Sequence, residues 1–99
     1  MNIIAIFSSR NETLYFSQLL KSNGIFCQIV NTPKEAGRAC GISVKFAYGA
    51  LQVARNLLMT KPFRAFVGFF KYSQFQGRNS LEKIWSSFLN KKYISYLCS

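Results

Sequence analysis

The sequence predicts an α+β protein. Three observations predict this class: short apolar runs rich in Ile, Val and Phe recur along the chain, apolar stripes at helical spacing lie between them, and strand-like and helix-like segments are interspersed. With 99 residues, of which 49% are hydrophobic, the chain is long enough for one packed core. We therefore expect a single domain over residues 1–99.

The first three elements are expected to be a strand, a helix and a second strand. Residues 3–7 are a continuous apolar run, which is typical of a strand buried in the middle of a sheet. A helix is expected to follow, with Ser9 or Asn11 as its N-cap, and to end before Gly24, because glycine favours the position after a helix. Residues 25–30 are expected to form the second strand, which ends before Pro33 because proline cannot donate a ladder hydrogen bond.

The next segments complete a known order of elements. Residues 34–40 are polar and are expected to hold one or two helical turns, and residues 42–46 alternate as a strand with one wet face. An apolar stripe predicts a helix over residues 50–58, and residues 64–72 are the candidate for a fourth strand. Strand, helix, strand, strand, helix, strand is the order of the ferredoxin-like split β-α-β (βαββαβ) fold.

The end of the chain is expected to add a third, C-terminal helix. Ser80 is a suitable N-cap, and five apolar residues follow at helical spacing: Leu81, Ile84, Trp85, Phe88 and Leu89. Lysines between and after them make this helix amphipathic and basic. We expect it to pack on the domain or on a second copy in a homodimer, and a membrane surface is the alternative. Residues 61–99 therefore differ in character from residues 2–60.

The composition excludes several kinds of site. The chain has a net charge of +10 and contains neither His nor Asp, and its only carboxylates are Glu12, Glu35 and Glu82. A Ser-His-Asp triad and His-ligated metal sites are therefore excluded. We expect neither a metal nor a cofactor. Any function must depend on the backbone, positive charge, aromatic surface or sulfur.

The cysteines indicate a reducing compartment. Cys27, Cys40 and Cys98 are odd in number and contain no C-x-x-C pair, so neither a disulfide framework nor a dithiol motif is expected. The apolar run after Met1 is too short for a signal peptide, and no apolar run is long enough to span a membrane. We therefore expect a cytoplasmic protein.

Four short segments carry a resemblance to a known family. These are the strand end at residues 7–9, the helix end at residues 19–25, the Thr-Pro-Lys-Glu segment at residues 32–35, and Cys40-Gly41-Ile42. In this order and spacing, residues 3–58 resemble a small bacterial and archaeal family of selenium/sulfur carrier-like proteins. The resemblance implies a ferredoxin-like fold and a cysteine, here Cys40, that carries sulfur or selenium as a persulfide or selenosulfide.

The sequence around Cys40 is suited to a reactive thiol. Thiolates are favoured by cations and by helix N-termini, and Arg38 lies two residues before Cys40. In a split β-α-β fold the cysteine would face the loop that starts the first helix, and Gly41 would let backbone N–H groups approach the sulfur. The groups expected to bind the anion or the partner are Ser8, Ser9, Arg10, Asn11, Thr32, Lys34 and Lys45. The alternative is that Cys40 is a small buried hydrophobic residue before a strand.

Aromatic and basic residues are interleaved in the second part of the chain. Such a pattern offers base-stacking platforms and phosphate contacts in RNA-binding proteins. The alternative nucleic-acid face would consist of Arg64, Phe66, Lys71, Tyr72 and Arg78. The same aromatic residues are equally suited to pack a core or an oligomer interface.

The sequence thus supports two functions of different classes. The first is a sulfur or selenium carrier, more a transfer protein than a turnover enzyme, whose positive surface attracts an acidic donor or acceptor protein. The second is a small basic module that binds nucleic acid. An interaction subunit with no chemistry of its own is the remaining alternative.

Overall fold

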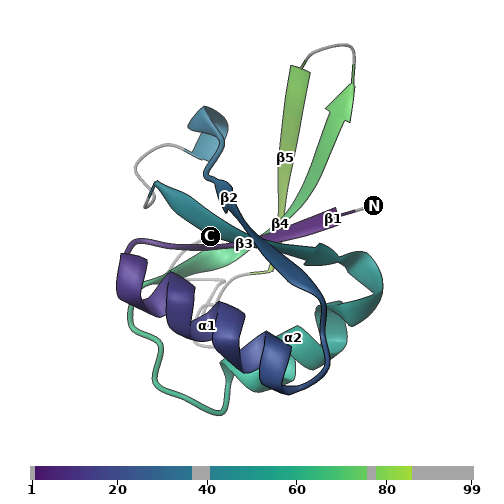
Figure 1. The fold of residues 1–99 in the computed structure, drawn as a ribbon. Helices are drawn as coiled ribbons and strands as arrows, with labels where there is room; N and C mark the ends of the chain where they lie inside the picture. Colours follow the sequence, from purple (N-terminus) through teal and green to yellow (C-terminus); the bar gives the residue numbers. More distant parts are fainter. Residues whose placement is uncertain (1, 37–40, 76–77, 86–99) are drawn as a thin grey trace, which may run out of the picture.

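The structure, a computed structural model, describes residues 2–36, 41–75 and 78–85. These residues contain five strands, two α-helices and two short 3₁₀-helices, labelled η. The strands form one sheet in the order β2-β3-β1-β4-β5, and every neighbouring pair is antiparallel (Figure 1). This confirms the predicted α+β class. The elements are β1 (Asn2–Phe7), α1 (Arg10–Ser22), β2 (Cys27–Asn31), η1 (Lys34–Ala36), β3 (Ile42–Ala47), η2 (Tyr48–Ala50), α2 (Leu51–Leu58), β4 (Phe66–Phe75) and β5 (Arg78–Trp85).

Both ends of α1 form as the local sequence predicts. Ser9 is the N-cap, and its side chain accepts a hydrogen bond from the Glu12 N–H. Gly24 has φ 78°, and the N–H groups of Gly24 and Ile25 donate to the carbonyls of Lys21 and Leu20. This pair of bonds is a Schellman motif, which requires the left-handed conformation that glycine adopts without strain.

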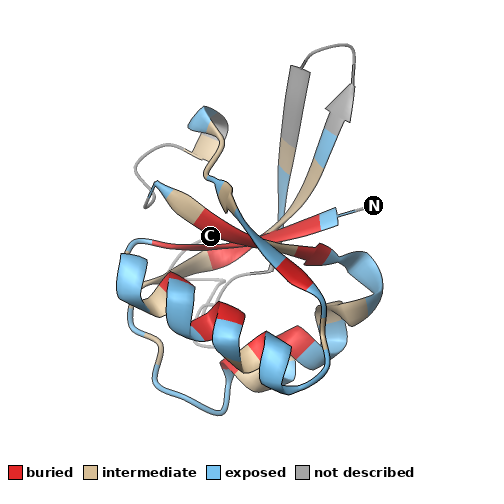
Figure 2. Ribbon diagram, viewed as in Figure 1, coloured by how far each residue is buried: buried red, intermediate tan, exposed pale blue. Residues whose placement is uncertain are grey.

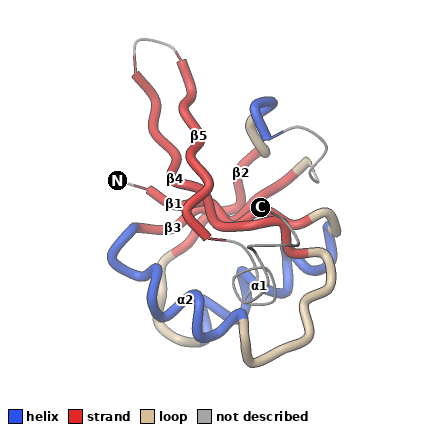
Figure 3. Tube along the Cα trace, turned by 180° about the vertical axis from the view of Figure 1, so that it is seen from behind, coloured by secondary structure: helices blue, strands red, loops and turns tan. Residues whose placement is uncertain are grey.

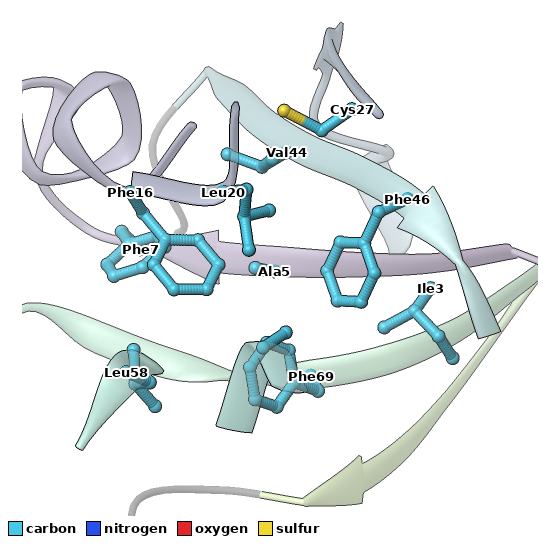
Figure 4. Close-up of a cluster of buried hydrophobic side chains, with 11 residues drawn as sticks. Ile3, Ala5, Phe7, Phe16, Leu20, Cys27, Val44, Phe46, Leu58 and Phe69 are labelled. Atoms are coloured by element: carbon cyan, nitrogen blue, oxygen red, sulfur yellow. The ribbon is translucent and has the colours of Figure 1, made fainter. Parts of the chain in front are cut away.

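The two α-helices cover one face of the sheet, and the core lies between them. Figures 1 and 3 show α1 and α2 on the same side, with η1 and the β4–β5 hairpin rising on the other. Side chains of β1, β3 and β4 point into this layer (Figure 4), where they meet the buried faces of the helices. The central strand β1 is buried on both faces, because Ile4 and Ile6 have no exposed surface although they point away from the helices (Figure 2).

A bulge in β4 decides which aromatic residues enter the core. Phe7 lies opposite Phe66 and Ile6 opposite Gly68, so one extra residue is inserted in β4. The bulge turns Phe66 and Phe69 to the same face, where their rings contact each other and the Phe7 and Phe16 rings, with Phe66 on Phe7 and Phe69 on Phe16. Three or more clustered rings of this kind stabilise a small core beyond the area that they bury.

The predicted C-terminal helix is wrong where the structure describes it. Residues 78–85 form the strand β5, which pairs with β4 from Phe75↔Arg78 to Phe69↔Trp85. Only Gln76 and Gly77 separate the two strands, and a two-residue connection with glycine is a hairpin signal. The Leu81 and Ile84 spacing also fits a strand here, since Ile84 packs against the core while Leu81 lies on the opposite face beside Tyr72. Residues 86–89 of the predicted helix lie outside the described residues.

Candidate functional site

One edge of the sheet collects most of the segments that the sequence singles out. Because β1 and β3 are antiparallel, β3 begins beside the end of β1, and the end of β2 lies opposite Ile42. β4 begins at the same edge, where Phe66 lies opposite Phe7. We call this edge, formed by residues 8–12, 32–34, 41–43 and 64–65, the loop edge. Arg38 and Cys40 belong to the connection that returns to it but lie outside the described residues.

The start of α1 lies at the loop edge and is held there by Glu12. The two carboxylate oxygens of Glu12 accept hydrogen bonds from the backbone N–H groups of Arg64 (3.0 Å) and Ala65 (2.8 Å). The Ser8 N–H in turn donates to the Ala65 carbonyl at 2.7 Å. Sequence reasoning placed Glu12 in the first helical turn but missed this clamp between the helix and the start of β4. The Ser-x-x-Glu spacing was a signal for a capping box, in which the glutamate would bond back to the N-cap instead.

The electrostatic effect of this arrangement at the helix start is mixed. Arg10 and Asn11 are exposed at the start of α1, where N–H groups that are not already hydrogen-bonded favour a bound anion. The Glu12 carboxylate in the same turn contributes a negative charge that opposes a second anion. The helix start therefore offers backbone donors and one cation at the loop edge, with part of its positive potential already neutralised.

Thr32 fixes the other side of the loop edge. Its N–H donates to the Gly41 carbonyl at 2.9 Å, which closes the base of the segment between β2 and β3. Its hydroxyl lies 2.5 Å from the hydroxyl of the fully buried Ser43. Gly41 is exposed, and a Cβ placed on it would meet no atom within 4 Å. The space beside Gly41 is therefore open.

The expected anion- and partner-binding residues are only partly brought together. Six of these residues lie at the loop edge: Ser8, Ser9, Arg10, Asn11, Thr32 and the exposed Lys34, which begins η1. Lys45 lies further along β3, opposite Ile4 of β1 and Gln28 of β2, on the face away from the helices.

Cys27 occupies a different environment from the one expected of a carrier thiol. Cys27 is 6% exposed and lies at the margin of the core, beside Val44 of β3 (Figure 4). Its thiol donates a hydrogen bond to the Ser17 carbonyl at 3.5 Å. Burial raises the pKa of the Cys27 thiol above its ordinary value, and the positive charge of Lys21 offsets only part of this effect. Cys27 is therefore a protonated, inaccessible thiol near neutral pH.

The residues of the alternative nucleic-acid face are distributed over different surfaces. Phe66 packs in the core, and Lys71 forms a 3.6 Å ion pair with Glu82. Tyr72, the next residue of β4, points to the opposite side of the sheet from Lys71. Arg64 is exposed ahead of β4, and Arg78 begins β5. Among those of these residues whose side chains the structure describes, Arg64, Phe66, Lys71 and Tyr72 do not form one continuous face.

The comparisons with known proteins give one match. Residues 2–65 match the model of the family described as Putative Se/S carrier protein-like. No curated protein and no solved structure matches the chain. Within the described part of the chain, none of the helices has the length and apolar character needed to cross a membrane. Over the same residues, no group of three or more His, Cys, Asp or Glu side chains is placed to hold a metal ion.

Proposed function

The chain belongs to the Putative Se/S carrier protein-like family, and on this premise we propose that it carries sulfur or selenium on Cys40 and passes it to a partner protein. The matched residues contain β1, α1, β2, β3 and α2 and end directly before β4, which pairs with β1. We further propose that β2-β3-β1-β4 and the two helices are the ferredoxin-like arrangement of a single cytoplasmic domain.

The observation that carries the proposal is the burial of Cys27. The family match contains two cysteines, Cys27 and Cys40, whereas Cys98 lies beyond it. A carrier thiol must be accessible and must ionise readily, because the thiolate is the nucleophile. Cys27 meets neither requirement, since it is buried and its pKa is raised. Cys40 is therefore the cysteine of the matched part that remains for the carrier role.

The surroundings of the connection that contains Cys40 support this role. The loop edge places the exposed Gly41 and Lys34 on either side of the connection, and Arg38 lies within it. Positive charges of this kind lower the pKa of a thiol and stabilise a persulfide anion. We assign Arg38 as the principal cation, because Glu12 already occupies part of the positive end of α1.

The transfer step needs no oxidant or reductant. The Cys40 thiolate attacks the terminal sulfur of a donor persulfide, so that an S–S bond forms to Cys40 while the S–S bond of the donor breaks. The donor sulfur leaves with the bonding electron pair as a thiolate, and the terminal sulfur keeps its oxidation state. A nucleophile of the acceptor protein then attacks this terminal sulfur, the S–S bond to Cys40 breaks, and Cys40 leaves with the bonding electron pair as a thiolate. Selenium can be transferred by the same displacement, in which it takes the place of the terminal sulfur and keeps its oxidation state.

Whole-protein mass spectrometry tests the proposal. The purified protein is incubated with a persulfide donor, and its mass is measured without reductant and again after dithiothreitol. We expect a reductant-sensitive gain of one sulfur atom in the parent protein and in Cys27→Ser and Cys98→Ser, and no gain in Cys40→Ser. A gain that persists in Cys40→Ser would refute the assignment. The absence of a gain in every protein would instead favour an interaction subunit without chemistry.

A further inference from the structure

The outer edge of β2 carries backbone groups with no partner among the described residues. β2 is the end strand of the sheet and pairs only with β3. The Thr32 N–H donates to the Gly41 carbonyl, so Thr32 is a hydrogen-bonded position of this ladder. Hydrogen-bonded and non-bonded positions alternate in an antiparallel pair. Gln28 and Val30 therefore direct their backbone groups toward β3, while Cys27, Ile29 and Asn31 direct theirs outward.

The β2 edge lacks the features that usually prevent a further strand from pairing. Natural edge strands are protected by charged side chains, prolines or bulges. The opposite edge strand, β5, contains Glu82 and Lys83, and its pairing with β4 is irregular. β2 has the sequence Cys-Gln-Ile-Val-Asn, with no charge, no proline and a regular register against β3. Figure 2 shows that most of this strand is exposed at the front of the sheet.

The surface beside the β2 edge is apolar and positively charged. Arg10, Leu14, Ser17 and Lys21 recur at the spacing of one face of α1, and the bond from Cys27 to the Ser17 carbonyl shows that this face lies over β2. Leu14 and Ile29 are 39% and 40% exposed, and Phe26, just before the strand, is 78% exposed. The charge of Lys21 acts on the Cys27 thiol, which places that cation at the same edge.

We propose that the β2 edge docks an extended, acidic segment of the partner protein, which adds to the sheet as a further strand. Main-chain hydrogen bonds to Cys27, Ile29 and Asn31 would supply the pairing, and apolar side chains would cover Ile29. Acidic side chains would meet Lys21 and Arg10. The identity of this partner as donor or acceptor rests on the function proposed above, whereas the docking itself does not.

Charge decides between this partner and a second copy of the chain. Pairing of two β2 strands about a two-fold axis would bring the Arg10 and Lys21 faces of two helices toward each other, in molecules that each carry a net charge of +10. Neither Glu82, which lies on β5 at the far edge, nor Glu12, which is bound by the backbone before β4, relieves this repulsion. An acidic strand meets no such repulsion.

The test measures amide hydrogen exchange by NMR in the full chain carrying Cys40→Ser, so that sulfur chemistry does not contribute. The probe is a short synthetic peptide in which valine alternates with glutamate, and its lysine counterpart is the control peptide. We expect the acidic peptide to slow exchange at Cys27, Ile29 and Asn31, while Gln28 and Val30, already paired with β3, change little. The lysine peptide is expected to have no effect.

Variants separate backbone pairing from general attraction of charge. Ile29→Pro removes the central outward N–H but no β2–β3 bond, so we expect it to keep its fold and lose the peptide; Ile29→Val should bind normally. Lys21→Glu should weaken binding by about tenfold or more, and Lys83→Glu at the β5 edge should not.

If the β2 amides gain no protection, or if Lys83→Glu weakens binding as much as Lys21→Glu, the proposal is wrong. Protection that grows with protein concentration in the absence of peptide would identify a second copy as the occupant and also refute it.

Discussion

Glu12 links the start of α1 to the start of β4 through a single side chain. Replacement by alanine leaves the Arg64 and Ala65 N–H groups without their acceptor, and we expect a loss of about 1–3 kcal/mol in the free energy of unfolding. Glu12→Gln keeps one acceptor oxygen and should lose less. Urea unfolding of both variants measures the difference. The exposed Glu82→Ala is the control and should change stability by less than about 1 kcal/mol; an equal loss there would contradict the clamp.

Cys27 makes stability depend on pH in the alkaline range. Burial raises the pKa of its thiol in the folded protein above the ordinary value of 9.0. Below that value the thiol is protonated in both states, and its contribution is constant. At higher pH the unfolded chain loses the proton first, so stability falls as pH rises through 9 toward the folded pKa.

We therefore expect the urea midpoint of the parent protein to decline more steeply above pH 9 than that of Cys27→Ala. All other ionisable residues are the same in the two proteins, so their contributions cancel in the difference. Parallel midpoint curves for the two proteins would mean that Cys27 is not held protonated by burial.

The pairing of β5 with β4 is the element that the sequence predicted as a helix. It places Lys71 opposite Glu82 at 3.6 Å, with the two side chains 34% and 68% exposed. We expect a double-mutant cycle, Lys71→Ala and Glu82→Ala, to give a favourable coupling of about 0.2–1 kcal/mol that weakens with salt. Lys71→Ala with Lys83→Ala is the control pair, since Lys83 lies on the other face over the Phe70 ring. Zero coupling in the first cycle would contradict the register.

Elements with local sequence signals were predicted well, whereas the bulge in β4 and the strand β5 were not. The α1 boundaries follow from Ser9 and Gly24, whose capping chemistry is local. The bulge in β4 and the strand β5 depend on which residues face each other across the sheet, and helical spacing in residues 81–85 is compatible with either structure. The bulge also placed Phe66 in the core, which alternation along an ideal strand does not reveal.

In the candidate site too, some features could be predicted from the sequence and others depend on contacts between distant residues. The antiparallel order predicted that the first two strands end where the third begins, and the structure confirms it at the loop edge. The Glu12 clamp joins Glu12 to Arg64 and Ala65, which lie 52 and 53 positions further along the chain, so no local sequence pattern predicts it. The exposed β2 edge was missed because Cys27–Asn31 contains no charged residue or proline of the kind that usually marks an edge strand, so its position depends on the strand order.

The whole molecule carries thirteen cations against three acids. This excess opposes the compact state by self-repulsion, and salt screens it. We expect the melting temperature to rise when ionic strength increases from about 0.01 M to about 0.15 M, a change that shortens the screening length from roughly 30 Å to roughly 8 Å. NaCl and KCl should act alike, because the effect is screening. An unchanged or falling melting temperature would show that the charges are already balanced by local contacts.

The central claim is that sulfur is carried on Cys40, and mapping the added sulfur within the chain tests it most directly. Trypsin cleaves after Lys and Arg, so the three cysteines fall in separate peptides: residues 22–34 with Cys27, 39–45 with Cys40, and 93–99 with Cys98. The protein is loaded with a persulfide donor, alkylated to cap thiols and persulfides, digested and sequenced by tandem mass spectrometry. We predict the capped persulfide on peptide 39–45 and an alkylated or unmodified thiol on the other two. A persulfide found chiefly on peptide 22–34 or 93–99 would contradict the account.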